Sequence, residues 1–383
     1  MIGFLAVIAA LAWGWLLLCR GRFWLVDLPG PVVEPAHWPE VVAVLPARDE
    51  ASVIAAAVRS LLCQDYPGRL SVIVADDHST DGTAELARAA ATLEGASERL
   101  TVVAAAPLPY GWSGKMWAQS QGIAAAASVY PGAELWLLTD ADIGHAPDQL
   151  RTMVARLEAE RRDMVSLMVR LSTDSLVEKA IVPAFVFFFR LLYPFRWVAD
   201  PSRATAAAAG GYILIRRTML ERVGGLEWIR DALIDDCTLA RRVKSSGGRL
   251  SLDLAERTVS LRQYTGVKGL WMMIARSAYT QLRCSPLLLA GTVAAMVVGF
   301  LLPPVLALAG GPAIAWLAWA EMAVAFAPML RFYRLPVIMA PLLPLVALFY
   351  MAATLDSARR HWAGRGGEWK GRLQAPSGGQ ENP

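Results

Sequence analysis

Hydrophobic and polar positions divide the chain into three regions. Residues 1–18 are apolar and uncharged, and residues 285–354 contain only three formal charges. Nearly all the carboxylates lie between these two regions, where short β-branched runs alternate with longer Ala-rich amphipathic runs from Pro39 onward. This alternation is typical of βαβ units that build a parallel sheet. The pattern therefore predicts a soluble α/β domain between membrane segments.

The β-branched runs predict five strands, at residues 41–45, 71–75, 100–104, 135–139 and 164–168. Helices are expected between them, at about residues 51–63, 81–92, 114–127 and 147–160. Ligands of such a sheet bind beyond the carboxyl ends of its strands. The polar motifs of this chain occur at those ends.

The first apolar segment has nearly the roughly 20 residues that a membrane-spanning helix needs. A signal peptide is the competing interpretation, but no basic region precedes the segment and no small-x-small cleavage site follows it. Its basic flank, Arg20 and Arg22, comes after the apolar run. This charge placement predicts an uncleaved anchor at residues 1–22 in a bacterial-type inner membrane. The chain that follows is then expected in the cytoplasm.

Two segments after the fifth predicted strand are also expected to contact the membrane. Residues 176–198, inside a domain predicted at residues 39–260, mix aromatic residues, arginines and prolines, which suits a helix in the headgroup region. An internal helix that covers the sheet is the alternative. Residues 261–284 are predicted to form an amphipathic segment at the membrane surface.

The C-terminal apolar region, residues 285–356, contains three apolar stretches. Three full spans would place the C-terminus outside, whereas the basic loop at residues 331–334 and the basic tail favour the inside. The third stretch contains three prolines that would break or kink a spanning helix. A re-entrant third segment would satisfy both constraints. Residues 357–383 are expected to form a basic, partly disordered tail.

Composition supports a membrane protein and excludes other classes. Hydrophobic residues make up 55% of the 383 residues and charged residues only 18%, which is too apolar for a typical soluble protein of this size. The four cysteines are scattered without a C-x-x-C pair, so neither a zinc cage nor a disulfide framework is indicated. The net charge of +4 does not indicate nucleic-acid binding and is better explained by basic flanks that meet anionic headgroups.

Two acidic motifs follow the first two predicted strands. Pro-Ala-Arg-Asp-Glu closes the first at residues 46–50, and Asp76 and Asp77 close the second. Adjacent aspartates at a strand end can accept hydrogen bonds from a base N–H and a ribose hydroxyl. The following Ser-Thr-Asp-Gly is also a good turn and helix-capping sequence.

A D-x-D motif follows the fourth predicted strand. Asp140 and Asp142 are two residues apart after a buried apolar run, so both can approach one divalent cation directly or through its water. Oxygen ligands suit Mg²⁺ or Mn²⁺, which would neutralise the charge that builds on a departing diphosphate. A lone D-x-D is commonly just solvated.

Asp235 and Asp236 open an amphipathic helix. A carboxylate near a helix N-terminus is stabilised by the helix dipole, which is the structural explanation and favours the ionised form. An ionised Asp236 could also take the proton from an attacking hydroxyl. If the carbon attacked is the anomeric carbon of a sugar, a single displacement of this kind inverts its configuration.

Lys115 follows a Gly-Trp-Ser-Gly sequence at the start of a predicted helix. Glycines around a lysine allow close backbone approach to a phosphate, and the amine supplies a point charge. The P-loop pattern is absent. A surface loop capped by Ser113 is the alternative.

Together these motifs, over roughly residues 39–260, resemble family 2 glycosyltransferases of the A fold. The resemblance implies a GT-A nucleotide-sugar-binding fold with a mostly parallel sheet. It implies that Asp77 contacts the nucleotide base, that Asp140 and Asp142 serve the diphosphate metal, and that Asp236 is the general base, with Asp235 replacing the usual Glu. The remaining implied donor residues are Ala47, Glu50, Asp76 and Lys115, and the implied acceptor-side glycines are Gly210 and Gly211.

Within that family, the arrangement of apolar segments is similar to that of ceramide glucosyltransferase and, more closely, of the bacterial hopene-associated glycosyltransferases. The Q-x-x-R-W signature of the processive and ceramide enzymes is absent after Asp236, which argues against a processive synthase. Arg262-Gln263-Tyr264, together with Trp271 and Arg276 on the acceptor side, are loose substitutes for this signature.

These features predict an inverting, metal-dependent enzyme that transfers a sugar from a UDP-sugar to a membrane lipid, in hopanoid or other glycolipid biosynthesis. A polyprenyl-phosphate glycosyltransferase and a small polysaccharide synthase are the enzymatic alternatives. A catalytically silent membrane scaffold is the non-enzymatic one.

Overall fold

The structure is a computed structural model and describes residues 2–28, 30, 33–264, 266–364, 368–369 and 372–373. The chain divides into two compact units. The sheet unit comprises Leu28–Leu171, Pro201–Gln263 and the residues from Gly367 onward. The apolar unit comprises Met1–Asp27, Ser172–Asp200 and Tyr264–Gly366.

The sheet unit is built on one eight-stranded sheet with the order β3-β2-β1-β4-β7-β6-β8-β5. β7 is antiparallel to its neighbours β4 and β6, and β5 is antiparallel to β8, while the other pairs of neighbours are parallel. The strands are β1 (Val41–Ala47), β2 (Leu70–Asp76), β3 (Leu100–Ala104), β4 (Leu135–Leu138), β5 (Ile143–Gly144), β6 (Met164–Arg170), β7 (Ile213–Arg216) and β8 (Leu250–Ser260). All five strands predicted from the sequence are confirmed.

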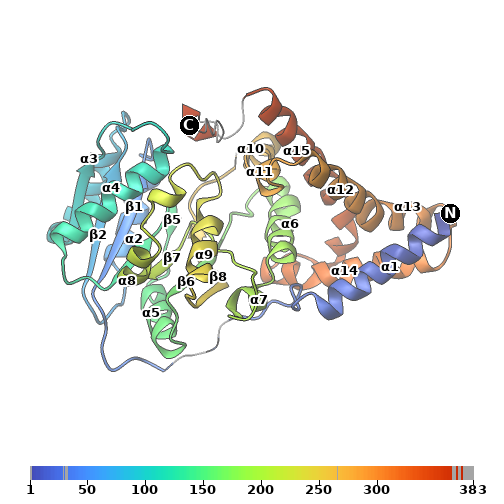
Figure 1. Cartoon of the computed structure of the whole chain (residues 1–383), viewed down its shortest axis with the longest axis horizontal. Helices are drawn as coiled ribbons and strands as arrows, with labels where there is room; N and C mark the ends of the chain where they lie inside the picture. The colour runs from blue at the N-terminus through green and yellow to red at the C-terminus, as the bar shows by residue number, and fades with distance from the viewer. Residues whose placement is uncertain are drawn as a thin grey trace, which may run out of the picture. The chain divides into compact units, whose positions relative to one another are not determined.

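The central strands are buried because helices cover the sheet. Every residue of β1 is buried, which explains its continuous apolar sequence, since a parallel strand between two layers has no solvent face. Figure 1 shows α3 and α4 with the strands at one end of this unit. The four predicted helices are confirmed as α2 (Ile54–Leu62), α3 (Thr83–Leu93), α4 (Gly114–Val129) and α5 (Gln149–Ala159).

Three strands lay outside the sequence prediction. β7 has only four residues and leads directly into α8 (Arg217–Arg222), so its apolar run is too short to be distinguished from the start of a helix. β5 has two residues, too few for a periodicity to appear. β8 has 11 residues and is therefore longer than β5 and β7. It follows α9 (Asp235–Ser245) and precedes the return of the chain to the apolar unit.

The apolar unit is helical. Its helices are α1 (Ile2–Cys19), α6 (Leu176–Leu192), α7 (Phe195–Ala199), α10 (Gly266–Ala275), α11 (Ala278–Gln281), α12 (Pro286–Met296), α13 (Leu302–Leu308), α14 (Ile314–Phe332) and α15 (Leu343–Trp362). Three helical runs are long and apolar enough to cross a membrane: Pro286–Leu308, Ile314–Phe332 and Val337–Trp362. The apolar helix at Gly3–Cys19 is shorter than these.

Prolines in these runs are accommodated without breaking them. A π-helical turn, η3 (Val297–Leu301), joins α12 to α13, and Pro303 lies in the first turn of α13. A proline cannot donate the usual backbone hydrogen bond and its ring clashes with a carbonyl one turn earlier, so a wider turn relieves both problems. In the third run, Pro341 lies in the 3₁₀ turn η4 (Val337–Leu342) and Pro344 in the first turn of α15, where a proline is tolerated.

Small side chains let α1 pack closely against α14. Ala9 and Ala10 form a buried cluster with Ala318, and Ala6 with Ala307 and Ala315. Small residues at a helix interface let the backbones approach closely and increase their van der Waals contact. Trp13 adds a hydrogen bond from its indole N–H to the Gly299 carbonyl at 2.8 Å. α1 is therefore anchored to the C-terminal helices of its unit (Figure 1).

The region predicted as one interfacial segment at residues 176–198 forms two helices, α6 and α7, separated at Tyr193–Pro194. α6 belongs to the apolar unit and packs against α10, α14 and α15. The positions of the predicted segments relative to a membrane, including a re-entrant third segment, remain predictions. Of the predicted tail, residues 357–362 continue α15, while residues 365–367, 370–371 and 374–383 lie outside the described residues.

Gly122 on α4 should be intolerant of a side chain. A Cβ at this position would lie 2.5 Å from Val44 Cγ1 and 3.3 Å from Ala75 Cβ, both in the sheet. Overpacking a buried contact costs about 1–3 kcal/mol, so Gly122→Ala should lower the melting temperature by several degrees in a thermal unfolding experiment. The matched control is Gly291→Ala, a helical glycine with nothing within 4 Å of a new Cβ. An unchanged melting temperature for Gly122→Ala would contradict the close packing of α4 on the sheet.

Candidate active site

The acidic motifs meet at the carboxyl edge of the sheet. β1 ends at Ala47, β2 ends at Asp76, and Asp140 follows β4 by two residues. These three strands are parallel neighbours in the order β2-β1-β4, so their carboxyl ends lie along one edge. The first residues of α9, Asp235 and Asp236, join this edge through the contacts described next.

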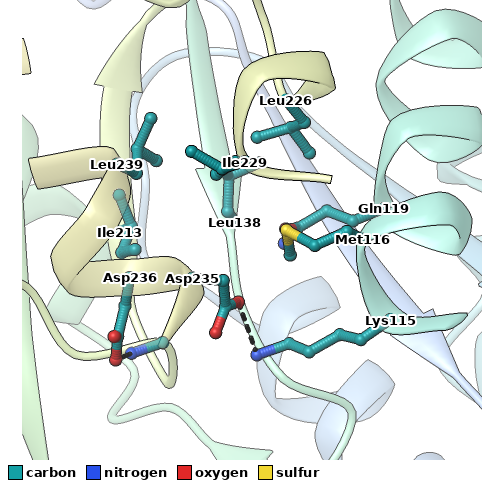
Figure 2. A pocket seen from close by; sticks show the side chains of 11 residues that line it. Lys115, Met116, Gln119, Leu138, Ile213, Leu226, Ile229, Asp235, Asp236 and Leu239 are labelled. Carbon is teal, nitrogen blue, oxygen red and sulfur yellow. Dashed lines mark hydrogen bonds and ion pairs between the residues drawn. The ribbon is translucent and has the colours of Figure 1, made fainter. Parts of the chain in front are cut away.

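Lys115 connects these segments. Its amine lies 2.9 Å from Asp140 Oδ1 and 3.1 Å from Asp235 Oδ2. Figure 2 shows the lysine reaching from α4 toward Asp235 at the start of α9. Burial alone would lower the pKa of Lys115, but the charges of Asp140, Asp235 and Asp236 raise it overall, well above its usual range. The lysine is therefore charged at every physiological pH, and it offsets the charge of this acidic cluster.

The position of Lys115 follows from the local structure of α4. Ser113 is the N-cap of this helix, and its hydroxyl accepts a hydrogen bond from the Met116 N–H at 3.3 Å. The Ser113 N–H in turn donates to the Arg230 carbonyl at 2.7 Å. The predicted cap thus exists, and it places Lys115 in the first turn of the helix. The amine contacts carboxylates in this structure, and a contact with a phosphate remains a prediction.

Gly210 lies where the lysine and two carboxylates converge. A Cβ there would be 3.2 Å from Lys115 Nζ and 3.7 Å from both Asp140 Oδ2 and Asp236 Oδ2. The Gly210 N–H donates to Asp236 Oδ2 at 2.9 Å. The backbone itself is therefore part of the site, and a side chain at this position would crowd the Lys115 amine. Gly211 is fixed separately, because its carbonyl accepts a 2.8 Å hydrogen bond from the Thr139 hydroxyl.

Asp236 has the electrostatics of a base that titrates near neutral pH. Burial, followed by the charge of Asp235, raises its pKa to about 6, while Lys115 and the N–H groups of Cys237 and Gly210 act in the opposite direction. The Cys237 N–H donates to Asp236 Oδ1 at 2.6 Å, so each carboxylate oxygen accepts one backbone hydrogen bond. The helix start was expected to favour the ionised form; burial outweighs that effect.

Asp140 and Asp142 fit a divalent cation bound together with a substrate. Burial, followed by the nearby charge of Asp140, raises the pKa of Asp142, and Arg262 opposes the rise. A shared cation would relieve this repulsion between like charges. Within the described ranges, no group of three or more His, Cys, Asp or Glu side chains is arranged to hold a metal ion. Mg²⁺ commonly uses one or two carboxylates plus substrate phosphates, so two aspartates are sufficient ligands from the protein.

Arg262 is a site residue whose role the sequence did not predict. Its Nε donates to Asp142 Oδ2 at 2.7 Å and its terminal nitrogen donates to Glu50 Oε1 at 2.8 Å. The sequence presented Arg262 only as part of a loose substitute for an absent signature. Its position directly after β8 would have indicated the sheet edge, had that strand been predicted.

The first two motifs form a buried polar corner. Asp77 is fully buried, its N–H donates to the Ala47 carbonyl at 2.8 Å, and its Oδ2 accepts from Arg48 at 3.2 Å. Among the described residues, buried Asp76 Oδ1 has no hydrogen-bond partner. An acceptor without a partner at a buried strand end is suited to a ligand donor, such as a hydroxyl or a base N–H. Arg48 is a further site residue that the sequence prediction missed, although it lies within the first motif.

A neutral histidine supports the D-x-D turn. His145 is buried, which lowers its pKa to about 3. Its Nε2 lies 3.2 Å from the Thr139 hydroxyl, which donates to the Gly211 carbonyl. Because the Thr139 hydroxyl proton is donated to the Gly211 carbonyl, the proton between Thr139 and His145 must belong to Nε2, which donates to the Thr139 oxygen. The pair links the residue before Asp140 to the glycine turn.

A pocket extends from this charged cluster into an apolar region. Its polar end is formed by Lys115, Gly210, Asp235 and Asp236. Figure 2 shows apolar side chains gathered above the charged ones. The other lining residues are Met116, Gln119, Leu138, Ile213, Leu226, Ile229 and Leu239.

Two predicted acceptor-side residues belong to the apolar unit. Trp271 lies in α10, and its indole N–H donates to Asp356 Oδ2 at 2.9 Å. Arg276 directly follows α10. The structure therefore gives Trp271 a packing role between α10 and α15, and a role for either residue in acceptor binding remains a prediction.

Comparison with known proteins finds one matching family model. Residues 42–224 match the family described as glycosyl transferase family 2. The matched range includes Asp77, Lys115, Asp140 and Gly210. A search of the curated proteins finds no match.

Two solved structures are similar to this chain, and the first shares its fold. The mannosyltransferase PcManGT from Pyrobaculum calidifontis, in complex with GDP-Man and Mn²⁺, aligns with a TM-score of 0.60 and 22% identity, over 93% of this chain and 99% of that chain. Mannosyl-3-phosphoglycerate synthase from Rubrobacter xylanophilus aligns with a TM-score of 0.39 and 19% identity, over 64% and 74% of the two chains. The predicted A-type glycosyltransferase fold is confirmed by the first likeness.

Lys115→Met should destabilise the protein in a pH-dependent way. Removing the cation leaves the partly buried Asp235 and Asp236 without the charge of Lys115 to offset them, and removing one partner of a buried pair typically costs about 3–5 kcal/mol. The pKa of Asp236, which burial already raises to about 6, then rises further above its unfolded-state value, so the loss of stability is largest at high pH and shrinks as the pH falls through the raised value. Chemical denaturation between pH 5.5 and 8 measures this trend.

The control is Lys268→Met, at an exposed position on α10. It should change the free energy of unfolding by less than about 0.5 kcal/mol at each pH. A Lys115→Met variant with the same pH dependence of stability as the wild type would contradict the proposed charge balance.

Proposed function

We propose that the protein is an inverting, metal-dependent glycosyltransferase that moves a sugar from a UDP-sugar onto a hydroxyl of a membrane lipid, in hopanoid or other glycolipid biosynthesis. The observation that carries the proposal is Asp236, a buried carboxylate with a pKa of about 6, held beside Lys115 and the D-x-D carboxylates. The family 2 match over residues 42–224 supports sugar transfer as the reaction.

The donor is assigned to the edge formed by β1, β2 and β4. The nucleotide base and ribose are assigned to the polar corner of Asp76 and Asp77, where a buried acceptor oxygen awaits a donor. Ala47 and Glu50 border this corner at the end of β1. Asp140 and Asp142 would hold Mg²⁺ or Mn²⁺, which when bound neutralises charge on the departing diphosphate. Lys115 adds a fixed positive charge at the same place.

The acceptor hydroxyl is activated by Asp236. Its two oxygens are each held by a backbone N–H, so the carboxylate cannot turn away from the site. As the acceptor oxygen bonds to the anomeric carbon, the bond from that carbon to the diphosphate breaks and the hydroxyl proton passes to Asp236. One displacement inverts the anomeric configuration. Asp235 positions Lys115 and raises the pKa of Asp236 by its charge.

A lipid acceptor is supported by the apolar unit. Three of its helices are long and apolar enough to cross a membrane, which would keep the enzyme at a bilayer. We infer an inner-membrane enzyme with its sheet unit in the cytoplasm, where nucleotide sugars are available. The hopanoid assignment rests on the resemblance of the apolar segments to the hopene-associated glycosyltransferases, and Gly210, Gly211, Trp271 and Arg276 are its acceptor-side residues.

The base distinguishes this proposal from its alternatives. A polyprenyl phosphate is already ionised and hardly needs a base, whereas a lipid hydroxyl does. The raised pKa of Asp236 therefore favours a hydroxyl acceptor. PcManGT binds GDP-Man, so GDP-mannose is the competing donor to be tested beside UDP-sugars.

Asp236→Asn should stop sugar transfer but spare donor binding. General-base catalysis contributes roughly 10²–10⁴-fold to a rate, and the amide cannot accept the proton. The experiment incubates the full chain in detergent with Mn²⁺, a lipid extract and labelled UDP-sugars or GDP-mannose. Transfer is measured by lipid extraction, and nucleotide binding by calorimetry.

The matched control is Asp253→Asn on β8, another carboxylate whose pKa burial raises to about 6, but which is paired with Arg156. It should retain transfer per folded molecule. Transfer by Asp236→Asn at the wild-type rate would remove Asp236 as the base, and an elongating product would identify a polysaccharide synthase instead.

Transfer should decline in acid with the titration of Asp236. Because the base acts only when ionised and its pKa is about 6, kcat/KM should be constant above that value and fall about tenfold per pH unit below it. The measurement is a pH profile of transfer at saturating Mn²⁺. A profile that stays flat down to pH 5 would contradict this assignment.

A further inference from the structure

Arg262 is held at the metal carboxylates by its backbone as well as by its side chain. The Leu261 N–H donates to the Asp142 carbonyl at 2.7 Å, and β5, next to Asp142, pairs with the end of β8. The Arg262 N–H donates to Ser260 Oγ at 3.3 Å. The segment that follows β8 therefore runs beside the D-x-D turn, and its first charged side chain faces that turn.

The guanidinium bridges two carboxylates of the candidate site. It donates to Asp142 Oδ2 at 2.7 Å and to Glu50 Oε1 at 2.8 Å, so it joins the turn after β4 to the end of β1. A guanidinium in this position satisfies a carboxylate oxygen that a divalent cation would also use. The two positive charges cannot share that oxygen closely without strong repulsion.

The carboxylates are fixed, whereas the guanidinium is more accessible. The side chains of Asp142 and Glu50 are 15% and 11% exposed, compared with 42% for Arg262. An arginine side chain has several rotatable bonds, and its planar fork matches two phosphate oxygens in geometry and charge. Arg262 can therefore leave Asp142 for an arriving diphosphate without any change in the sheet.

We propose that Arg262 occupies the cation position of the donor-free site and moves to the diphosphate when the nucleotide and metal bind together. The inference rests on the proposed function, because it assumes a nucleoside diphosphate and a divalent cation at this edge. Metal alone then binds weakly, because it must displace the guanidinium. Metal and nucleotide bind cooperatively, because the diphosphate accepts the displaced arginine.

Such cooperativity is a coupling free energy that both ligands share. Replacing Arg262 by glutamine should tighten Mn²⁺ alone by about tenfold and weaken a nucleoside diphosphate in the presence of Mn²⁺ by about tenfold. If Arg262 merely ordered the carboxylates, its replacement would instead weaken the binding of Mn²⁺ alone. The two effects of Arg262→Gln together should therefore abolish most of the coupling.

The test uses the full chain in detergent and compares the wild type with Arg262→Gln, Arg262→Lys and Arg257→Gln. Arg257 is a control on β8 that pairs with Asp148 at 2.6 Å and lies outside the site. Free Mn²⁺ is followed by electron paramagnetic resonance without nucleotide, and UDP and GDP binding by calorimetry with Mn²⁺. Lysine keeps the charge but loses the fork, so its Mn²⁺ affinity should lie between those of wild type and glutamine variant.

Tighter Mn²⁺ binding by Arg262→Gln, with Arg257→Gln unchanged, is the supporting result. Equal or weaker Mn²⁺ binding by both Arg262 variants would overturn the exchange while leaving the proposed function intact. A wild-type protein that binds neither UDP nor GDP with Mn²⁺ would overturn the proposed function, and this inference with it. Thermal unfolding of each variant identifies any loss of binding caused by misfolding.

Discussion

The charge of Lys115 is the interaction on which the site depends. Asp140 follows a strand and Asp235 begins a helix almost a hundred residues later, yet both carboxylates contact the same amine. Without that cation, their mutual repulsion and the loss of solvation would oppose the approach of α9 to the sheet edge. The amine can reach both because α4 begins at a capped Ser113 and lies flat on the sheet at Gly122. Packing of a helix thus sets the electrostatics of the whole edge.

The carboxylates at this edge lie in different environments. Both oxygens of Asp236 accept backbone hydrogen bonds, and burial raises its pKa to about 6. Asp140 contacts Lys115 and Asp142 contacts Arg262, so each of these two carboxylates is paired with a cation. Chemically identical carboxylates can have different pKa values when their surroundings differ, which lets one site contain groups with different roles.

The sequence predicted most of this arrangement, because its signals are local. Five strands and four helices were visible as apolar periodicities, and Asp76, Asp140 and Asp236 each follow or begin an element whose position could be predicted. The partners were not visible in the same way. That Arg262 contacts Asp142 and Glu50 depends on β8 lying next to β6 and β5, and these are pairings between segments far apart in the sequence. The raised pKa of Asp236 likewise depends on burial by side chains from several elements. Tertiary contacts of this kind have no periodicity in the sequence.

Glu178 has a consequence for how the chain passes between its two units. Its carboxylate accepts the N–H groups of Asp174 and Ser175 at the start of α6, and also the N–H of Tyr264, 86 residues later. One buried side chain therefore ties together an entry point and a re-entry point of the apolar unit. Both segments therefore depend on one carboxylate for their backbone hydrogen bonds. Only Gln263 separates Tyr264 from Arg262 along the chain, so the boundary of the apolar unit lies two residues from the arginine that contacts Asp142.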